Sequence, residues 1–356
     1  MGEMIYVGVD LHKTQFTVCV LIDDQEVGIT AKYDTGREGY ESFISRMQIL
    51  AAEYGRDISI AVESTANARY FREVMEDNGF FVSVVNTLRF KVVNLSTKKT
   101  DKNDARTLAE FLSRDMIPQS HLCSVRSEGL RRVLKSRSLM VQDAVALKNQ
   151  AHAVLLAYGH ITKTAQFQTK KERSMITATL PEQQARVVIP IFETLDAVEN
   201  QRRSLEKHLK TITSEDRTVR LLMTIPGIGV VNACTICAYI DDISRFESYK
   251  HFSAYCGLVP WVQTSNESVY YGRITKRGPQ ELRTAIVQCV VAMVRMENTT
   301  KGMAMIRQYH ELKDQKSSGK AIIATARKLT RIIYVMLKTQ TPFDMGKLIG
   351  SRGNII

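Results

Sequence analysis

Four acidic residues in the first third of the chain have the types and spacing of a metal-binding site. Asp10 ends an apolar stretch, YVGVD, and Glu63 ends a second one, SIAVE. Asp101 and Asp104 lie three residues apart at the expected start of a helix, where residues i and i+3 share one face. Carboxylates gathered together repel one another unless a cation is present, and hard oxygen ligands suit Mg²⁺, with Mn²⁺ as an alternative. Such an ion can polarise a phosphodiester for cleavage.

Asp10 and Glu63 are expected to lie close together, because each ends an apolar strand. The carboxyl ends of strands in an α/β sheet gather at one edge, where ligands usually bind. An acid that ends an apolar strand is costly unless it is exposed or bound to a cation. Simpler interpretations remain open: Asp101 as a helix N-cap, Asp104 as a first-turn acid that favours the helix dipole, and Glu63 as a surface acid.

Positive charge accompanies the acids. The formal net charge is +12, and the segment from Asp216 to the end holds 20 Lys and Arg against 10 Asp and Glu. The segment around Asp101 is basic as well, with Lys98, Lys99 and Lys102. This distribution favours a polyanionic partner, and we expect nucleic acid. An inert basic surface is the alternative.

Two C-terminal segments carry groups suited to phosphate binding. IPGIG, residues 225–229, precedes an expected helix and is typical of a helix-hairpin-helix turn. There Gly227 and Gly229 would let main-chain N–H groups approach a phosphate, although a tight turn without a ligand is the simpler interpretation. Three basic residues in GRITKRG are also placed for phosphate contacts: Arg273, Lys276 and Arg277.

The elements expected around these residues form an α/β domain followed by helices. Apolar or alternating patterns predict strands over residues 4–10, 15–22, 26–35, 57–64 and 80–86. Helical spacing lies between them, over residues 39–54 and 68–79. This order predicts a sheet with antiparallel and parallel pairs, followed by a basic loop over 89–106 that leads into a further helix.

The rest of the chain is expected to be mainly helical. Two amphipathic stretches near 128–158 and 181–212 predict an antiparallel helix pair or a short coiled coil. The final segment carries breaks at residues 241–242, 257–278 and 317–319. We therefore expect three parts: a catalytic domain over 1–125, a helical oligomerisation region over 126–215 and a C-terminal domain over 216–356.

Composition narrows the class of protein. Cys234 and Cys237 form a C-x-x-C without a second ligand pair at suitable spacing, so buried packing is favoured over a zinc site. Six scattered cysteines fit a reducing cytoplasm. No apolar run is long enough for a membrane helix, and the N-terminus lacks the pattern of a secretion signal.

Together these motifs resemble the DEDD transposases of the insertion-sequence 110 family. The matching strings are YVGVDLHK, VEST, KTDKNDARTLAEFL, IPGIG and FSAYCGLVPWVQTSNESVYYGRITKRGPQELRTAI. The resemblance implies a RuvC-like, RNase H-type N-terminal domain that holds Mg²⁺ on the four acids. It also implies a mostly α C-terminal transposase domain with a helix-hairpin-helix element and a serine that attacks DNA.

The resemblance assigns the nucleophile to Ser265. On its own a loop serine is rarely a nucleophile, because its hydroxyl must be activated by a base or a metal. The family's S-G-x-S-V motif matches Ser265-Asn266-Glu267-Ser268-Val269 here. Asn266 stands where glycine is usual, and asparagine tolerates the left-handed backbone. Ser268 remains a rival nucleophile.

The resemblance also implies partners. These are donor and target DNA and a bridge RNA that pairs with both, so that the protein reads backbone and shape. Four strand cuts require a dimer or tetramer, and we expect a cytoplasmic prokaryotic protein that is associated with the nucleoid when bound to DNA. Two alternatives stay open: a RuvC-like hydrolytic nuclease or junction resolvase, which would not need Ser265, and a non-catalytic nucleic-acid-binding protein.

Overall fold

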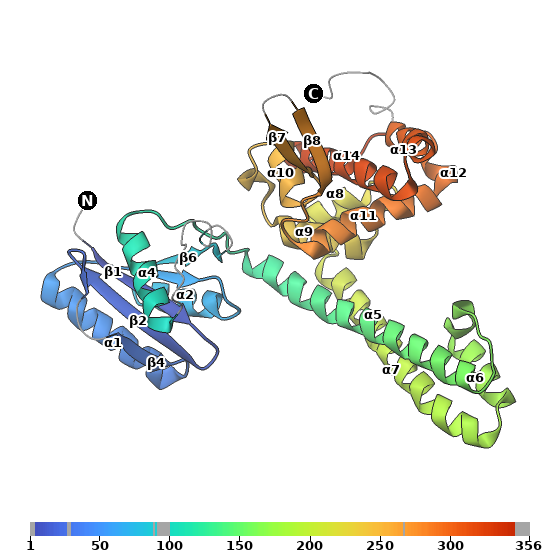
Figure 1. Cartoon of the computed structure of the whole chain (residues 1–356), viewed down its shortest axis with the longest axis horizontal. Helices are drawn as coiled ribbons and strands as arrows, with labels where there is room; N and C mark the ends of the chain where they lie inside the picture. Colours follow the sequence, from blue (N-terminus) through green and yellow to red (C-terminus); the bar gives the residue numbers. More distant parts are fainter. Residues whose placement is uncertain (1–3, 27–29, 88–89, 91–99, 266–267, 346–356) are drawn as a thin grey trace. The chain divides into compact units, whose positions relative to one another are not determined.

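The chain divides into two compact units, Met1–Leu122 and Cys123–Ile356, each with its own hydrophobic core (Figure 1). This computed structural model describes residues 4–26, 30–87, 90, 100–265 and 268–345. Unit 1 is the expected α/β domain, and unit 2 is mostly helical. In the described residues, no helix is both long and apolar enough to cross a membrane.

The sheet of unit 1 contains both kinds of strand pairing, as the sequence predicts. Its strands are β1 (Ile5–Leu11), β2 (Gln15–Ile22), β3 (Gln25–Glu26), β4 (Ala31–Asp34), β5 (Ile58–Glu63) and β6 (Phe81–Val85). The order is β3-β2-β1-β5-β6, with β4 also paired to β2. β1 is antiparallel to β2 and parallel to β5, which is parallel to β6. The single third strand expected over 26–35 is wrong, since β3 and β4 pair separately with β2.

Helices cover both faces of this sheet. Alternate residues of β1, such as Val7 and Val9, pack in one core with α1 (Arg37–Tyr54) and α2 (Ala68–Asp77). The other face packs against α4 (Asp101–Ser113), whose Ala105 and Ala109 contact the β2 side chains. The period-two alternation of the strands therefore decides which face each β1 side chain points to.

A close approach joins α4 to β1. A Cβ added at Gly8 would lie 1.9 Å from the main-chain oxygen of Ala105 and 2.6 Å from the nitrogen of Ala109. Only glycine leaves room for the helix at this point. The helix begins at Asp101, inside the segment expected to be a loop over 89–106, because the Thr100 hydroxyl accepts a hydrogen bond from the Asn103 N–H and caps it.

Unit 2 begins with the long helix pair that the sequence predicts. The helices are α5 (Val125–Ala157) and α7 (Glu182–Ile212), with η1 (Thr164–Phe167) and α6 (Lys170–Thr179) between them. Ion pairs join Arg137 to Glu206 at 2.8 Å and Lys148 to Glu199 at 3.3 Å. From the first ion pair to the second, the residue number rises along α5 and falls along α7, so the two helices are antiparallel. Figure 1 shows them side by side. Phe167, at the turn, is fully buried between them.

The remaining helices of unit 2 surround one large core. They are α8 (Arg217–Met223), α9 (Val230–Ile240), α10 (Tyr249–Tyr255), α11 (Gln280–Arg295), α12 (Glu297–Thr300), α13 (Ala304–Gln315) and α14 (Ser318–Thr339), with a short η2 (Ile243–Arg245). Cys234 and Cys237 lie in this core, where burial raises the pKa of the Cys237 thiol to about 12. Both thiols are therefore packing residues.

An antiparallel hairpin occupies part of the break expected at 257–278. Its strands are β7 (Pro260–Ser265) and β8 (Ser268–Ile274), and the sequence analysis did not predict them. The loop after β8 returns tightly to α10, since a Cβ at Gly278 would lie 1.9 Å from the main-chain oxygen of Tyr255. The base of the hairpin is thereby fixed on the helical core.

Candidate active site

The strand register brings Asp10 and Glu63 to the same edge and the same face of the sheet. Val9 pairs with Val62 in parallel β1 and β5, so the next residue of each strand carries one of the acids. Two residues earlier in each strand lie Gly8 and Ala61, which face α4. Because alternate residues share a face, both acids lie on the α4 side, at the carboxyl ends of their strands.

The first turn of α4 supplies the other two acids. Thr100 is the N-cap, so Asp101 and Asp104 belong to the first turn itself and Asp101 is not the cap. The close contact of this helix with Gly8 places its start beside the end of β1. The D-x-x-D spacing then turns both carboxylates toward the edge that carries Asp10.

Two of the four acids share a histidine. The Nε2 atom of His12 lies 3.1 Å from Asp10 Oδ2 and 3.7 Å from Asp101 Oδ1. Ligand atoms of these three residues all lie within 4.8 Å of one another, which is the spacing of a candidate metal site. The group does not include Glu63, which the register places at the neighbouring strand end, or Asp104, which acts on Asp10 through its charge.

The electrostatics of Asp10 show how these acids interact. Burial raises the pKa of its carboxyl above the ordinary value, His12 opposes the shift, and the charges of Asp101 and Asp104 raise it further. The side chain is only 14% exposed. A divalent cation would remove this repulsion, so the residues fit a hard metal ion, with one nitrogen donor among the oxygens.

Sequence reasoning missed His12 and Lys32. The Nζ atom of Lys32 lies 3.5 Å from Asp101 Oδ2. Asp10 pairs with Thr17 and Thr17 with Lys32, so the three residues form one row across β1, β2 and β4. The sequence offers one signal for His12, its place two residues after Asp10 in DLHK. It offers none for Lys32, because the position of Lys32 depends on the register of β4.

The main chain at His12 is held by the segment after Glu63. The side-chain nitrogen of Asn67 donates to the His12 carbonyl at 2.9 Å, and the Thr65 hydroxyl donates to Asn67 Oδ1 at 3.0 Å. The ends of β1 and β5 are therefore tied together at the site. This link favours a fixed position for the histidine ring.

The basic residues predicted near Asp101 have different placements. Lys102 is exposed, and its Nζ lies 3.7 Å from Glu26. Lys98 and Lys99 lie outside the described residues. Of the three predicted phosphate contacts here, only Lys102 is therefore placed by the structure, on the α4 side of the sheet.

Ser265 lies at the end of β7. It pairs with Ser268 at the start of β8, and residues 266–267 between them fall outside the described part, as do the side chains of both serines. Three exposed cations follow on β8 and in the loop after it: Arg273, Lys276 and Arg277. The Lys276 carbonyl accepts a hydrogen bond from Arg283 at 3.0 Å, which ties this loop to α11.

The two glycines of IPGIG have different surroundings. Gly227 has φ +85°, and a Cβ there would lie 2.7 Å from the Met293 side chain, so packing against α11 accounts for this glycine. Gly229 caps α9 without a side-chain hydrogen bond, and a Cβ there would meet nothing within 4 Å. Only Gly229 lies open at a helix start where a phosphate could approach.

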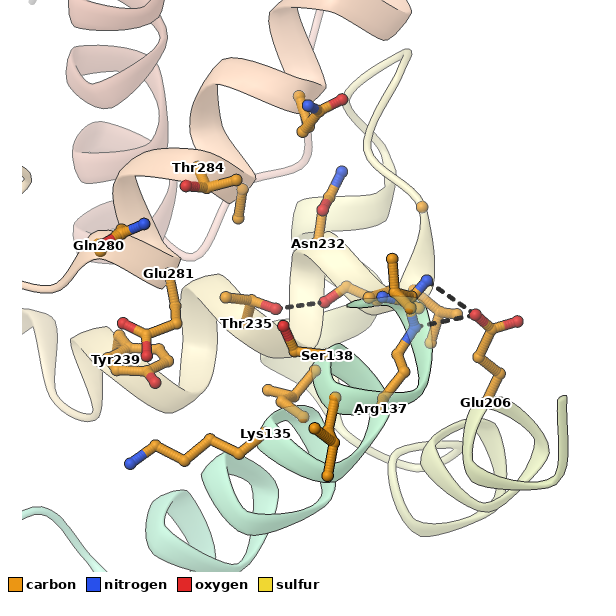
Figure 2. A pocket seen from close by; sticks show the side chains of 18 of the residues that line it. Lys135, Arg137, Ser138, Glu206, Asn232, Thr235, Tyr239, Gln280, Glu281 and Thr284 are labelled. Carbon is orange, nitrogen blue, oxygen red and sulfur yellow. Dashed lines mark hydrogen bonds and ion pairs between the residues drawn. The ribbon is translucent and has the colours of Figure 1, made fainter. Parts of the chain in front are cut away.

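Gly229 borders a groove of unit 2 with a volume of about 1190 Å³. Figure 2 shows polar side chains from α5, α9 and α11 around it, among them Ser138, Asn232 and Thr284. Its two acids are engaged: Glu206 pairs with Arg137 at 2.8 Å, and Glu281 hydrogen-bonds Tyr239. The lining suits a polar or anionic ligand better than a metal ion.

Comparison with known proteins identifies two transposase family models in the chain. A DEDD-type IS110 model described as "Transposase" matches residues 7–160, and one described as "Transposase IS116/IS110/IS902 family" matches residues 219–304. The first match includes all four acids and the second includes the hairpin.

Relatives support the same assignment over nearly the whole chain. The transposase for insertion sequence element IS1111A of Coxiella burnetii is 24% identical over 97% of this chain and 93% of its own length. The transposase for IS1328 of Yersinia enterocolitica is 28% identical over 80% of this chain and 85% of its own. The pilin gene-inverting protein of Moraxella lacunata is 24% identical over 95% and 97%. The resemblance inferred from the motifs is thus confirmed, and the chain belongs to the IS110 family of insertion-sequence transposases, which bind DNA, cut its strands and transfer them.

Proposed function

We propose that this transposase cuts and rejoins DNA by a metal-dependent reaction in which Ser265 becomes covalently bonded to the DNA. The observation that carries the proposal is the convergence of Asp10 and Asp101 at one edge of the sheet, with the charge of Asp104 in range. In a chain of this family, such a group of acids is best explained as the site of the divalent ion that strand cleavage uses.

In this proposal Asp10, Glu63, Asp101 and Asp104 hold Mg²⁺ or Mn²⁺. The bound ion supplies charge neutralisation at the scissile phosphate. The chain's own residues keep the site assembled, because Gly8 admits α4 and the Asn67 contact fixes the end of β1. A RuvC-like, RNase H-type fold for unit 1 belongs to the same proposal, supported by the mixed sheet with helices on both faces.

The proposed chemistry of Ser265 is an exchange of phosphate esters. Its hydroxyl oxygen bonds to phosphorus, the bond from phosphorus to one DNA oxygen breaks, the serine proton leaves to solvent, and the departing DNA oxygen takes up a proton to become a hydroxyl. One ester replaces another, so the strand can be rejoined by the reverse reaction without ATP. Arg273, Lys276 and Arg277 would neutralise phosphate charge next to the hairpin.

The proposal includes two kinds of partner. Donor and target DNA are the substrates, and a bridge RNA pairs with both and selects the sequences, while the protein contacts backbone and shape. The polar groove beside Gly229 supports a nucleotide ligand, because its hydroxyls and amides match ribose and base edges. A dimer or tetramer would supply enough copies of the acids and of Ser265 for the four strand cuts.

Denaturing electrophoresis of the protein with labelled DNA, its RNA and Mg²⁺ tests the serine step. Wild-type protein should give a DNA-linked band that Ser265→Ala loses, while Ser268→Ala keeps it. A band that survives in Ser265→Ala and disappears in Ser268→Ala assigns the nucleophile three residues later. DNA cleavage by the wild type without any linked band would instead favour the hydrolytic nuclease, which shares the four acids.

A further inference from the structure

The β7–β8 hairpin exposes large apolar side chains that folding does not require. Trp261 is 48% exposed, Tyr270 65% and Tyr271 67%. A two-stranded ribbon has little core of its own, and exposed aromatic groups of this size usually mark a contact surface. The ribbon ends at Ser265 and Ser268, so this surface lies next to the proposed nucleophile.

The strand register sorts these side chains by face. Gln263 pairs with Tyr270, and Trp261 lies two residues before Gln263, so Trp261 and Tyr270 share a face. Their ring centroids lie 6.3 Å apart at an interplanar angle of 74°. A Cβ at Gly272 would lie 2.9 Å from the Trp261 ring, so the glycine lets the indole rest on the ribbon. The two rings form a continuous aromatic face, which we call the Trp261–Tyr270 face.

The charge of the hairpin segment indicates which class of partner the Trp261–Tyr270 face binds. Between Pro260 and Gln280 the chain has three basic residues, Arg273, Lys276 and Arg277, and one acidic residue, Glu267. Exposed aromatic rings beside cations are the features that bind nucleic-acid strands, since the rings stack on bases while the cations contact phosphates. A purely apolar protein partner would not need the cations.

Spacing sets which bases the face can reach. Strands rise about 3.3 Å per residue, so Tyr270 lies about 7 Å along β8 from Ser268, and Trp261 about 13 Å along β7 from Ser265. In a strand that keeps the stacking of B-DNA, each nucleotide adds about 3.4 Å along the axis. The face therefore spans bases about two to four nucleotides from a phosphate held at Ser265.

We propose that the Trp261–Tyr270 face stacks on unpaired DNA bases two to four nucleotides from the phosphate that Ser265 attacks, and so positions the strand for the reaction. Trp261 and Tyr270 are thus positioning residues of the DNA site. The proposal rests on the proposed function for the place of the attacked phosphate, but stacking itself needs no chemistry.

Trp261 is the only tryptophan in the chain, so its fluorescence reports on the face directly. Full-length Ser265→Ala protein, which cannot form the adduct, is titrated with a duplex that carries an unpaired central bubble. Saturable quenching is expected, and Tyr270→Ala should weaken the affinity by about ten-fold. Phe81→Ala, which removes a similarly exposed ring on β6, is the control and should bind normally.

A second readout maps the contacted bases. 2-Aminopurine is placed at each of the first six positions from the joined phosphate in the wild-type adduct. Its fluorescence should change most at positions two to four, the change should be lost in Trp261→Ala and kept in Trp261→Phe, and circular dichroism checks that each variant is folded.

The outcomes separate this proposal from the proposed function. Quenching by DNA without any adduct in the wild type would support stacking and contradict the serine step. An adduct that forms while Trp261 fluorescence stays unchanged would overturn stacking and leave the serine step intact. A Trp261 signal that follows protein concentration in the absence of DNA would assign the face to a second copy of the chain and also overturn the proposal.

Discussion

The main-chain oxygen of Ala105 lies 1.9 Å from the point that a Cβ on Gly8 would occupy. Backbone meets backbone here, so no side chain can move aside to relieve a clash. The contact places the start of α4, with Asp101 and Asp104, beside the end of β1, with Asp10. One glycine thus connects the packing of the domain to the geometry of the site.

Gly8→Ala should therefore damage both stability and metal binding. The added methyl must push α4 away from β1, at a cost of about 1–3 kcal/mol or more, and the first turn of the helix should move away from Asp10. Urea unfolding and Mn²⁺ titration would measure the two effects. Gly36→Ala is the control, since a Cβ there meets nothing within 4 Å. Normal Mn²⁺ affinity in Gly8→Ala would show that the helix contact does not position the acids.

Asp10→Asn should abolish DNA cleavage and leave the protein folded. We expect a loss of about 100-fold or more in rate, because a charged ligand of the metal is removed. Cleavage of labelled DNA in Mg²⁺ measures this loss, and Asp77→Asn, at the end of α2, is the control. Full activity in Asp10→Asn would remove Asp10 from the site.

The difference in stability between Asp10→Asn and the wild type should change with pH in a definite direction. The folded-state pKa of Asp10 is raised, chiefly by burial, so its ionised form destabilises the metal-free fold above that pKa. The penalty should fade as the pH falls through the folded pKa toward the ordinary value of 3.8. In EDTA, the Asp10→Asn protein should thus be more stable than the wild type at pH 7, with a gap that narrows on acidification. A gap that widens toward low pH would contradict the raised pKa.

His12 should contribute to metal affinity. Its Nε2 lies within reach of both Asp10 and Asp101, so His12→Ala removes a candidate nitrogen ligand or a group that orients the acids. We expect Mn²⁺ binding to weaken by about 10–100-fold. Pulsed electron paramagnetic resonance of bound Mn²⁺ separates the two roles, because direct ligation gives a ¹⁴N coupling that His12→Ala loses. His251→Ala, at a surface histidine of α10, should change neither signal.

The acids were predictable because their positions follow from local patterns. Asp10 and Glu63 end apolar strands, and parallel strands end at the same edge of a sheet. The role of Lys32 depends instead on the register of β4 against β2, and that of His12 on the packing that brings Asp101 of α4 beside the end of β1; local sequence patterns show neither. The β7–β8 hairpin was missed for a different reason. Its aromatic residues are exposed, so the alternation of buried and exposed positions that marks a strand is absent.

Gly229→Asp should stabilise the fold while it weakens nucleic-acid binding. α9 has no side-chain cap, φ at Gly229 is −87°, and the space for a Cβ is open, so aspartate can cap the helix and add a few tenths of a kcal/mol. The same carboxylate would occupy the N–H groups and repel phosphate. Thermal unfolding and filter binding of RNA and DNA measure the two effects. Gly229→Ala, which adds no charge, is the control, and unchanged binding in Gly229→Asp would exclude a phosphate contact here.

The helix pair α5–α7 is expected to join protomers. Its internal contacts are already satisfied: burial alone would raise the pKa of Glu199, but hydrogen bonds from Arg202 and Lys148 lower it overall. Apolar residues nevertheless remain exposed on the outside, including Val145 at 53% and Leu156 at 63%. These two lie eleven residues apart, about three helical turns, so they point to nearly the same side of α5. An outward apolar stripe on a well-packed pair favours contact with another copy.

The double variant Val145→Glu/Leu156→Glu should therefore be monomeric and still folded. Both side chains are surface positions within the chain, so the free energy of unfolding should change by only about 0.5 kcal/mol, whereas two buried charges at an interface would be prohibitive. Sedimentation equilibrium, with and without nucleic acid, measures the assembly. Ile49→Glu, at an exposed apolar position on α1, should leave it unchanged. Because strand exchange between two duplexes needs several active sites at once, the monomeric variant should also fail to recombine DNA; recombination by a protein that stays monomeric on nucleic acid would refute the role of the helix pair.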